Sequence, residues 1–291
     1  MDKSSRQPLV SIVIVTWNRI YEVVKCINSA LNQTYSPIEV LVVDNASTNE
    51  TVKTIEMLYP QVRIIRLHRN VGCPEGRNIG FSNAKGDILF ALDDDGWLEK
   101  QAIEKIVDRF NVKPTVGVIQ AKILDGRKNP IRSCYMHEFS GGACAIKREV
   151  IDKAGYYPHD FFRQGEESDL AIRVLEAGYD IIYYPDAVMY HKPSKKCRQD
   201  KNEILRYQII NSTRVAVKYY PLFYSFLFII YKWTVHLFKG VFQGNLRVFY
   251  DVFYLIPAIC ASCRQRRPVS LSIFKKRQSL KKAFNLDNSS K

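Results

Sequence analysis

Three consecutive carboxylates, Asp93, Asp94 and Asp95, follow a short apolar run. Adjacent carboxylates repel one another unless a cation neutralises them. Mg²⁺ typically takes one or two carboxylates together with substrate phosphates. Because side chains alternate along a strand, Asp93 and Asp95 point the same way. The residues predict a divalent-cation site, with a solvated acidic turn as the alternative. His191, after a later strand-like run, is either a third ligand or a structural histidine.

A second acidic group, Glu166, Glu167 and Asp169, opens a segment whose apolar residues recur at helical spacing. A carboxylate here could be a general base that takes a proton from an attacking hydroxyl. Carboxylates at a helix start are also stabilised by the helix dipole and can simply cap the helix. The segment therefore offers three candidates for a base, each with a structural alternative.

Two segments that contain glycines are weaker candidates for ligand binding. Gly72 and Gly76 precede Arg77, whose guanidinium could face phosphate or the acidic cluster. Gly141 and Gly142 permit close approach of a ligand to the backbone, and the alternative is an ordinary turn before a helix.

Short β-branched runs alternate with helical segments through the first part of the chain. The strand-like runs are 10–16, 38–43, 62–67, 87–92 and 116–120, and the helical segments are 21–32, 51–58, 77–84 and 101–110. This alternation predicts an α/β fold with a mostly parallel sheet and helices on both faces. Ligands of such folds bind at the carboxyl ends of the strands. Polar residues recur there, namely Thr16, Asn18, Asp44, Asn70 and Asp93 to Asp95.

Composition fits a folded globular protein, with 46% hydrophobic and 25% charged residues among 291. It excludes collagen-like, low-complexity and disulfide-scaffold classes. The seven cysteines complete no zinc-site pattern, so we expect reduced thiols. The apolar run after the polar N-terminus is too short for a secretory signal, which favours a cytoplasmic protein.

The charge is unevenly distributed, with a net −2 over residues 1–191 and a net +16 over 192–291. Aromatic, apolar stretches at 219–231 and 248–259 do not reach the roughly 18–20 uncharged residues that a membrane span needs. Interspersed Lys and Arg predict helices in a membrane interface, next to a tail attracted to anionic lipid. The alternative is packing on the rest of the chain or on a second subunit of a homodimer. No nucleic-acid motif accompanies the tail.

Taken in order, these segments resemble glycosyltransferase family 2. The matching segments are 10–19, 39–47, 70–80, 86–96, 141–142 with Arg148, 165–173 and 190–191, within residues 8–195. The resemblance implies a GT-A fold, which is Rossmann-like, over residues 1–200. Amphipathic helices and the basic tail would follow over 201–291. The later half is most similar to the rhamnosyltransferase-like members that build bacterial surface polysaccharides.

The resemblance also implies roles for individual residues. Asp93 and Asp95 match the DxD motif that holds Mg²⁺ or Mn²⁺ on the donor diphosphate, and His191 matches a histidine that meets the metal or the diphosphate. Glu167 has the position of the catalytic base, where the family commonly has Asp, and Glu166 or Asp169 could serve instead. The residues that would bind the donor are Thr16, Asn18, Asp44, Asn70, Arg77 and Asp94, the first three holding the base and ribose. The residues that would border the sugar and acceptor are Trp97, Gly141 and Gly142.

The implied activity is inverting transfer of a sugar from a UDP- or dTDP-sugar to a hydroxyl of a glycan or lipid-linked acceptor. The basic tail would place the enzyme at the inner face of the cell membrane. One rival is a sugar-phosphate nucleotidyltransferase, which would need a glycine-rich basic loop where this chain has Thr16 to Arg19. Another is a membrane-tethered nucleotide-sugar-binding protein without catalytic activity.

Overall fold

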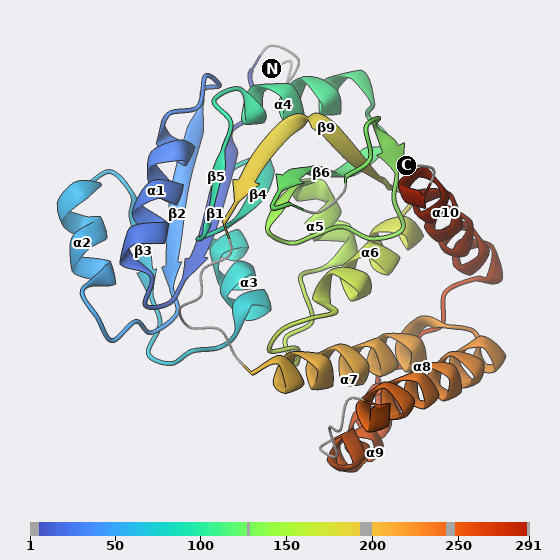
Figure 1. Ribbon diagram of the computed structural model, residues 1–291. Helices are drawn as coiled ribbons and strands as arrows, with labels where there is room; N and C mark the ends of the chain where they lie inside the picture. Colours follow the sequence, from blue (N-terminus) through green and yellow to red (C-terminus); the bar gives the residue numbers. More distant parts are fainter. Residues whose placement is uncertain (1–5, 127–128, 193–199, 243–247, 290–291) are drawn as a thin grey trace.

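A nine-stranded sheet forms the centre of the computed structural model, which describes residues 6–126, 129–192, 200–242 and 248–289 (Figure 1). The strand order is β3-β2-β1-β4-β8-β6-β9-β5, and β7 pairs with β9. The bounds are β1 Val10–Thr16, β2 Ile38–Asp44, β3 Arg63–Arg66, β4 Ile88–Asp93, β5 Gly96–Leu98, β6 Val116–Leu124, β7 Cys134–Tyr135, β8 Ala143–Lys147 and β9 Asp180–His191.

The first four strands in this order are parallel, as the sequence predicts. The register pairs Thr16 of β1 with Asp44 of β2, and Val15 of β1 with Asp93 of β4. The carboxyl ends of these three strands therefore lie at one edge of the sheet, where the polar residues were expected. This edge carries the candidate site.

The second half of the sheet is mixed, so the predicted predominance of parallel strands applies only to the first half. β8 is antiparallel to both β4 and β6, and β9 is parallel to β6 but antiparallel to β5. A parallel return would need a crossover of a dozen or more residues, usually a helix. Within the described residues, no helix lies between β6 and β8, so β8 returns antiparallel.

Helices cover both faces of the sheet, as predicted. One core cluster packs α1 (Ile20–Leu31), α2 (Thr51–Leu58) and α4 (Ala102–Val112) on one face. A second cluster packs α3 (Cys73–Asn83), α5 (Arg148–Ala154) and α6 (Glu166–Glu176) on the other. α3 begins at Cys73, four residues before the predicted start at Arg77, and Pro74 in its first turn favours that start. Gly76 and Gly80 lie against valine side chains of β1, where a Cβ would clash.

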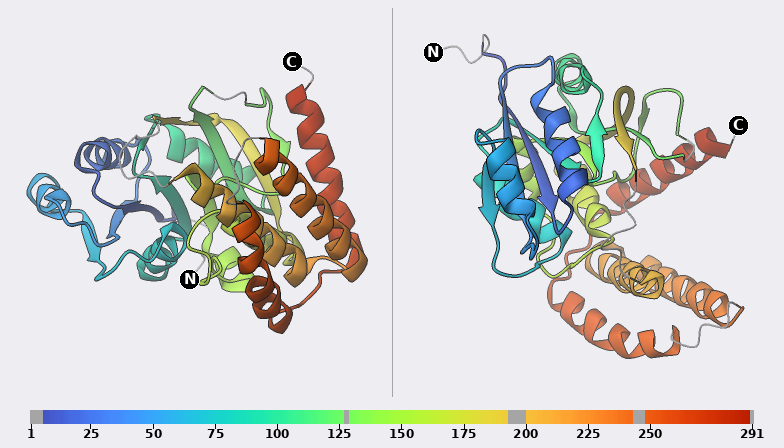
Figure 2. Two further views of the ribbon diagram at one scale, coloured as in Figure 1. Left: turned by 60° about the horizontal axis from the view of Figure 1, so that its bottom comes forward. Right: turned by 60° about the vertical axis from the view of Figure 1, so that its left-hand side comes forward.

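Four further helices follow: α7 (Lys201–Tyr219), α8 (Leu222–Phe242), α9 (Val248–Arg264) and α10 (Leu271–Ser289). Figure 2 shows α7 to α9 as a layer beside the sheet domain, with α10 returning along that domain. A third core cluster joins Phe161 and Ile172 to residues of α7 and α10. The boundary predicted at residue 200 follows the segment 193–199, which lies outside the described residues. Among the helices described, none is both long and apolar enough to cross a membrane.

Candidate active site

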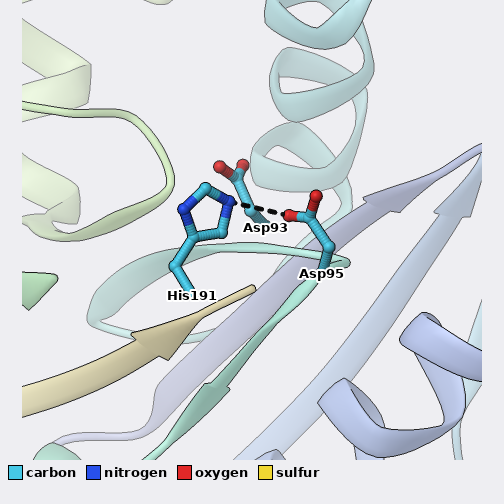
Figure 3. A group of neighbouring side chains, drawn as sticks. All are labelled: Asp93, Asp95 and His191. Atoms are coloured by element: carbon cyan, nitrogen blue, oxygen red, sulfur yellow. Dashed lines mark hydrogen bonds and ion pairs between the residues drawn. The ribbon is translucent and has the colours of Figure 1, made fainter. Parts of the chain in front are cut away.

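Two aspartates and a histidine converge at the strand ends (Figure 3). Asp93 ends β4, Asp95 lies in the turn to β5, and His191 ends β9, where it pairs with Gly96. One possible ligand atom from each lies within 4.8 Å of the others, and the His191 Nε2–Asp95 Oδ1 distance is 3.1 Å. These are the three residues that the sequence offers as candidate metal ligands, and segments far apart in the chain bring them together. We call these three side chains the metal group.

The chemistry of this group fits a divalent cation. Two carboxylates supply the oxygen ligands that Mg²⁺ and Mn²⁺ take, and the imidazole supplies a nitrogen. His191 Nδ1 is buried and lies 3.6 Å from Asp125 Oδ2. Metal-binding histidines commonly direct the second ring nitrogen to a carboxylate in this way. Asp125 is therefore part of the surroundings of the site, although no sequence pattern around it indicated this.

Asp94 lies on the other side of the turn and is buried. It accepts a hydrogen bond from Thr16 Oγ1 at 2.8 Å and pairs with Arg19 Nη1 at 2.6 Å. Burial raises the pKa of Asp94 to about 7, against the opposing effect of Arg19. Arg19 also contacts Asp95 Oδ2 at 3.2 Å. Sequence reasoning missed Arg19, whose only signal was its place just after the first strand.

Arg77 links the two acidic groups. Its side chain, on α3, is only 6% exposed and contacts Asp93 Oδ1 at 2.7 Å through Nη2. Nη1 lies 3.7 Å from Glu166 Oε1 and 3.9 Å from Glu167 Oε1. The sequence offered phosphate or the acidic cluster at residues 93–95 as the partner of Arg77, and the guanidinium does contact that cluster through Asp93. A buried guanidinium between these carboxylates offsets their mutual repulsion.

Gly141 and Gly142 pass between these side chains. A Cβ on Gly142 would clash with the Asp93 carboxylate, and one on Gly141 would clash with the Arg77 guanidinium. The Gly141 amide donates a hydrogen bond to Glu167 Oε1 at 3.1 Å. The close approach that the two glycines allow therefore brings the backbone to Asp93, Arg77 and Glu167.

The three carboxylates of α6 differ in their surroundings. Glu166 is buried, and burial, with the neighbouring Glu167 charge, raises its pKa to about 8. Burial also raises the pKa of Glu167, while Arg77 opposes the shift. The Glu167 side chain is 23% exposed and the most accessible of the three. Asp169 is 1% exposed and pairs with Arg173 Nη2 at 2.7 Å.

The residues expected to bind the donor lie at the carboxyl ends of β1 and β2 and in the loops that follow β1 and β3. The Asp44 carboxylate oxygens accept hydrogen bonds from the Ser47 amide at 3.2 and 3.3 Å, so this side chain caps the turn that follows β2. Asn18 Oδ1 accepts from the Thr48 amide at 2.8 Å, so the first two loops are joined. Asn70 Oδ1 accepts from the Gly72 amide at 3.0 Å within its own loop.

Trp97, on β5, lies beside an aromatic partner that the sequence did not indicate. Its ring stacks on Tyr190 of β9 with centroids 5.6 Å apart, because the two residues are paired in the β5–β9 register. The Lys25 ammonium lies 2.9 Å from the Trp97 ring centroid. Tyr190 directly precedes His191 in β9, and successive side chains of a strand point to opposite faces of the sheet, so the register does not direct this aromatic pair toward His191.

Asp169→Asn is expected to lower the free energy of unfolding by about 3–5 kcal/mol, because it removes the anionic partner of buried Arg173 and a carboxylate beside buried Lys218. Urea denaturation measures the change. Asp152→Asn, on the exposed side of α5, is the control, with an expected change within about 0.5 kcal/mol. Equal stability of the two variants would contradict a structural role for Asp169.

Known proteins with a similar sequence indicate the family of the chain. An uncharacterized glycosyltransferase, YwdF of Bacillus subtilis, is 37% identical over 169 residues, 52% of this chain and 62% of that protein. A chondroitin synthase of Escherichia coli is 37% identical over 108 residues, 36% of this chain and 16% of that protein. The chain thus covers less than two thirds of either relative.

A solved structure of GalNAc-T7 with UDP, GalNAc and Mn²⁺ superposes with a TM-score of 0.63 at 18% identity, over 75% of this chain and 49% of that one. This likeness supports the GT-A type of fold. The model of the family "Glycosyl transferase family 2" matches residues 11–162, which run from the second residue of β1 to beyond β8 and include both aspartates of the metal group. The chain belongs to glycosyltransferase family 2.

Proposed function

We propose that this protein is an inverting glycosyltransferase that moves a sugar from a nucleoside-diphosphate donor to an acceptor hydroxyl. The observation that carries the proposal is the position of Arg77, which contacts Asp93 of the metal group and lies beside Glu167. A site for a diphosphate and a carboxylate able to take a proton are thereby held together. Transfer of a sugar needs both.

Asp93, Asp95 and His191 would hold Mg²⁺ or Mn²⁺. A bound cation neutralises negative charge on a departing nucleoside diphosphate. GalNAc-T7, which shares the fold, was solved with UDP and Mn²⁺ bound, and this supports the assignment. Arg19 and Arg77 already balance part of the acidic charge. We expect them to hold the carboxylates in place before the cation and donor arrive.

Glu167 is the general base in this proposal. It takes the proton of the acceptor hydroxyl as that oxygen bonds to the anomeric carbon, from the face opposite the diphosphate. The bond from that carbon to the phosphate oxygen breaks, and the nucleoside diphosphate leaves with the electron pair. One displacement inverts the configuration without a covalent enzyme intermediate. Glu167 suits this role better than Asp169, which is paired with Arg173, or Glu166, which is more deeply buried.

The donor is proposed to be a UDP- or dTDP-sugar carrying a hexosyl or rhamnosyl group. The loops with Thr16, Asn18 and Asp44 would receive the base and ribose. Asn70 and Asp94 would complete the donor pocket. Trp97, Gly141 and Gly142 would border the sugar and acceptor. The acceptor is proposed to be a glycan or lipid-linked hydroxyl in surface polysaccharide or glycolipid assembly.

A thermal-shift panel tests the proposed function directly. UDP, dTDP and GDP, and sugar derivatives of each, are added with MnCl₂ or with EDTA. A ligand that binds the folded state raises the melting temperature. We expect a rise for one nucleotide class that depends on Mn²⁺, and release of nucleoside diphosphate from its sugar derivative. A rise without any release would favour the non-catalytic binding protein, and no rise for any nucleotide would contradict both.

The face of α8 and α9 is proposed to dock on an anionic membrane at the inner side of the cell membrane. Large apolar side chains are exposed along both helices, among them Phe226, Tyr231, Phe249 and Phe253. Aromatic and basic residues together are typical of helices that lie at the headgroup level. Two basic residues of the expected polybasic tail have another role. Arg266 donates to the backbone carbonyls of Val217 in α7 and of Tyr220 just after that helix, and Arg277 is buried.

Phe226→Ser combined with Phe253→Ser is expected to reduce sedimentation with phosphatidylglycerol-containing vesicles by about tenfold or more. Each substitution removes an exposed ring whose burial in the membrane would contribute about 1.5–3 kcal/mol to the free energy of binding. The control is Met57→Ser with Val112→Ser, which changes exposed apolar residues of α2 and α4. Unchanged sedimentation would argue against docking by this face. A shift from dimer to monomer on light scattering would assign it to a homodimer interface instead.

A further inference from the structure

The turn before α6 has an unusual backbone. Gln164 has a φ of 65° and Gly165 a φ of 87°, both in the left-handed region. Glycine adopts this region readily, whereas a residue with a side chain does so only where its surroundings hold it. Glu166 and Glu167 follow at once, so the conformation of the turn sets the direction in which both carboxylates leave the helix.

Asn211 of α7 holds this turn. Its side-chain amide is buried, with the residue 2% exposed, and Nδ2 donates to the carbonyl oxygens of Arg163 at 2.9 Å and Gln164 at 2.7 Å. A primary amide has two donors in one plane, so one side chain fixes both carbonyls. A Cβ on Gly165 would lie 3.1 Å from the Asn211 Cβ. The helix therefore also packs tightly against the glycine.

The other side of the first turn of α6 is held from α10. The Arg277 side chain is 6% exposed, and Nη2 donates to Ser168 Oγ at 2.8 Å. Ser168 in turn donates to Glu138 Oε2 at 2.8 Å, and Arg277 Nη1 donates to the Tyr220 hydroxyl at 2.8 Å. Helices that follow residue 200 thus contact the chain on both sides of Glu167.

We propose that Asn211 is a positioning residue for glycosyl transfer, because it fixes the backbone from which Glu167 projects. The inference rests on the proposed role of Glu167 as the base. A general base must lie within hydrogen-bond reach of the proton it takes, and a displacement of about 1 Å can cost a large factor in rate. The C-terminal helices therefore complete the catalytic domain, in addition to any contact that they make with a membrane.

Asn211→Ala is expected to lower kcat for release of nucleoside diphosphate by about tenfold or more, with the KM for the donor within about twofold. The donor is the nucleotide-sugar identified by the thermal-shift panel. Thr213→Val is the matched control on the same helix. Thr213 is also buried, but its hydroxyl bonds to Trp233 Nε1 and the Ile209 carbonyl, away from the turn. Its kcat is expected to stay within about twofold of the wild-type value.

A double variant separates positioning from general loss of structure. In the Glu167→Gln background, Asn211→Ala should reduce kcat no further, since residues that act through one group are not additive. Equal kcat in Asn211→Ala and Thr213→Val, or a full additional loss in the double variant, would overturn the positioning role. Wild-type turnover in Glu167→Gln alone would instead refute the proposed base.

If Asn211→Ala does not fold, Asn211→Ser replaces it under the same criteria. The serine hydroxyl supplies one donor where the amide supplies two. We expect a reduction in kcat of about threefold or more, again with the donor KM unchanged. A kcat equal to that of Thr213→Val would overturn the proposal in this variant as well.

Discussion

Glu167→Gln is expected to lower the turnover of glycosyl transfer by about 10²–10⁴-fold, the contribution typical of a general base. The substitution keeps the size of the side chain and a hydrogen-bond acceptor for the Gly141 amide, which now lies 3.1 Å from Oε1. It removes the ability to take a proton together with one negative charge beside Arg77, which keeps its contacts with Asp93 and Glu166. Donor affinity, measured by isothermal titration with the nucleotide-sugar and Mn²⁺, is therefore expected to stay within about twofold.

Glu166→Gln is the matched control, because it makes the same change one residue earlier. The raised pKa of Glu166, about 8, means that its carboxyl is largely protonated near neutral pH, and glutamine resembles that form. We expect its turnover to fall by less than about tenfold. Full turnover in Glu167→Gln combined with a large loss in Glu166→Gln would transfer the role of base to Glu166.

The same base predicts how turnover depends on pH. Glu167 must be ionised to take a proton, and burial raises its pKa above the ordinary value for a glutamate. The value of kcat should therefore increase with pH until Glu167 has lost its proton. The midpoint of this acidic limb of the pH profile should lie at a higher pH than the pKa of an exposed glutamate. A profile of kcat with an acidic limb near the ordinary glutamate pKa, about 4.3, would contradict the burial argument.

The parts of the fold that depend on local pattern could be predicted from the sequence. Buried β-branched runs located the first strands, and the polar residues after them located the edge that carries the site. The antiparallel position of β8 could not be predicted, because the partner of a strand is decided by contacts far away in the chain. The first turn of α3 was missed because Gly72 and Gly76 resemble loop residues, yet Gly76 makes room for Val15.

In the candidate site, too, the sequence indicated some residues and could not indicate the partners that the fold brings to them. The acidic run indicated the two carboxylates, although Asp95 lies in the turn after β4 and not on the strand, so strand alternation is not what directs it to the site. The family pattern indicated His191. The partners of these residues could not be predicted, because Arg19 and Asp125 belong to segments that only the folded sheet brings to the site. Arg277 was grouped with a lipid-binding tail, since charge composition cannot distinguish a buried guanidinium from an exposed one. Its burial among Ser168, Glu138 and Tyr220 is a tertiary property.

Asp95→Asn is expected to weaken Mn²⁺ binding by at least about 100-fold, since changes to groups that only support a metal ligand already cost 10–100-fold. The Asp95 carboxylate faces both His191 and Arg19, and an amide keeps its shape but loses its charge. Arg19 keeps its contact with Asp94, so the ligand-free protein should still fold. Titration with Mn²⁺, followed by calorimetry in the presence of UDP or dTDP, measures the affinity.

Two control variants make the metal test specific. Asp125→Asn changes the carboxylate 3.6 Å from His191 Nδ1 and should weaken Mn²⁺ binding by about 10–100-fold, less than the direct ligand. Asp152→Asn, exposed on α5, should leave it unchanged. The graded order Asp95, Asp125, Asp152 follows from their places as a proposed ligand, the neighbour of a proposed ligand and an exposed residue of α5. A general loss of negative charge would instead affect all three alike. Nucleotide affinity that is equal in Mn²⁺ and EDTA for the wild-type protein would instead assign the diphosphate to Arg19 and Arg77 alone.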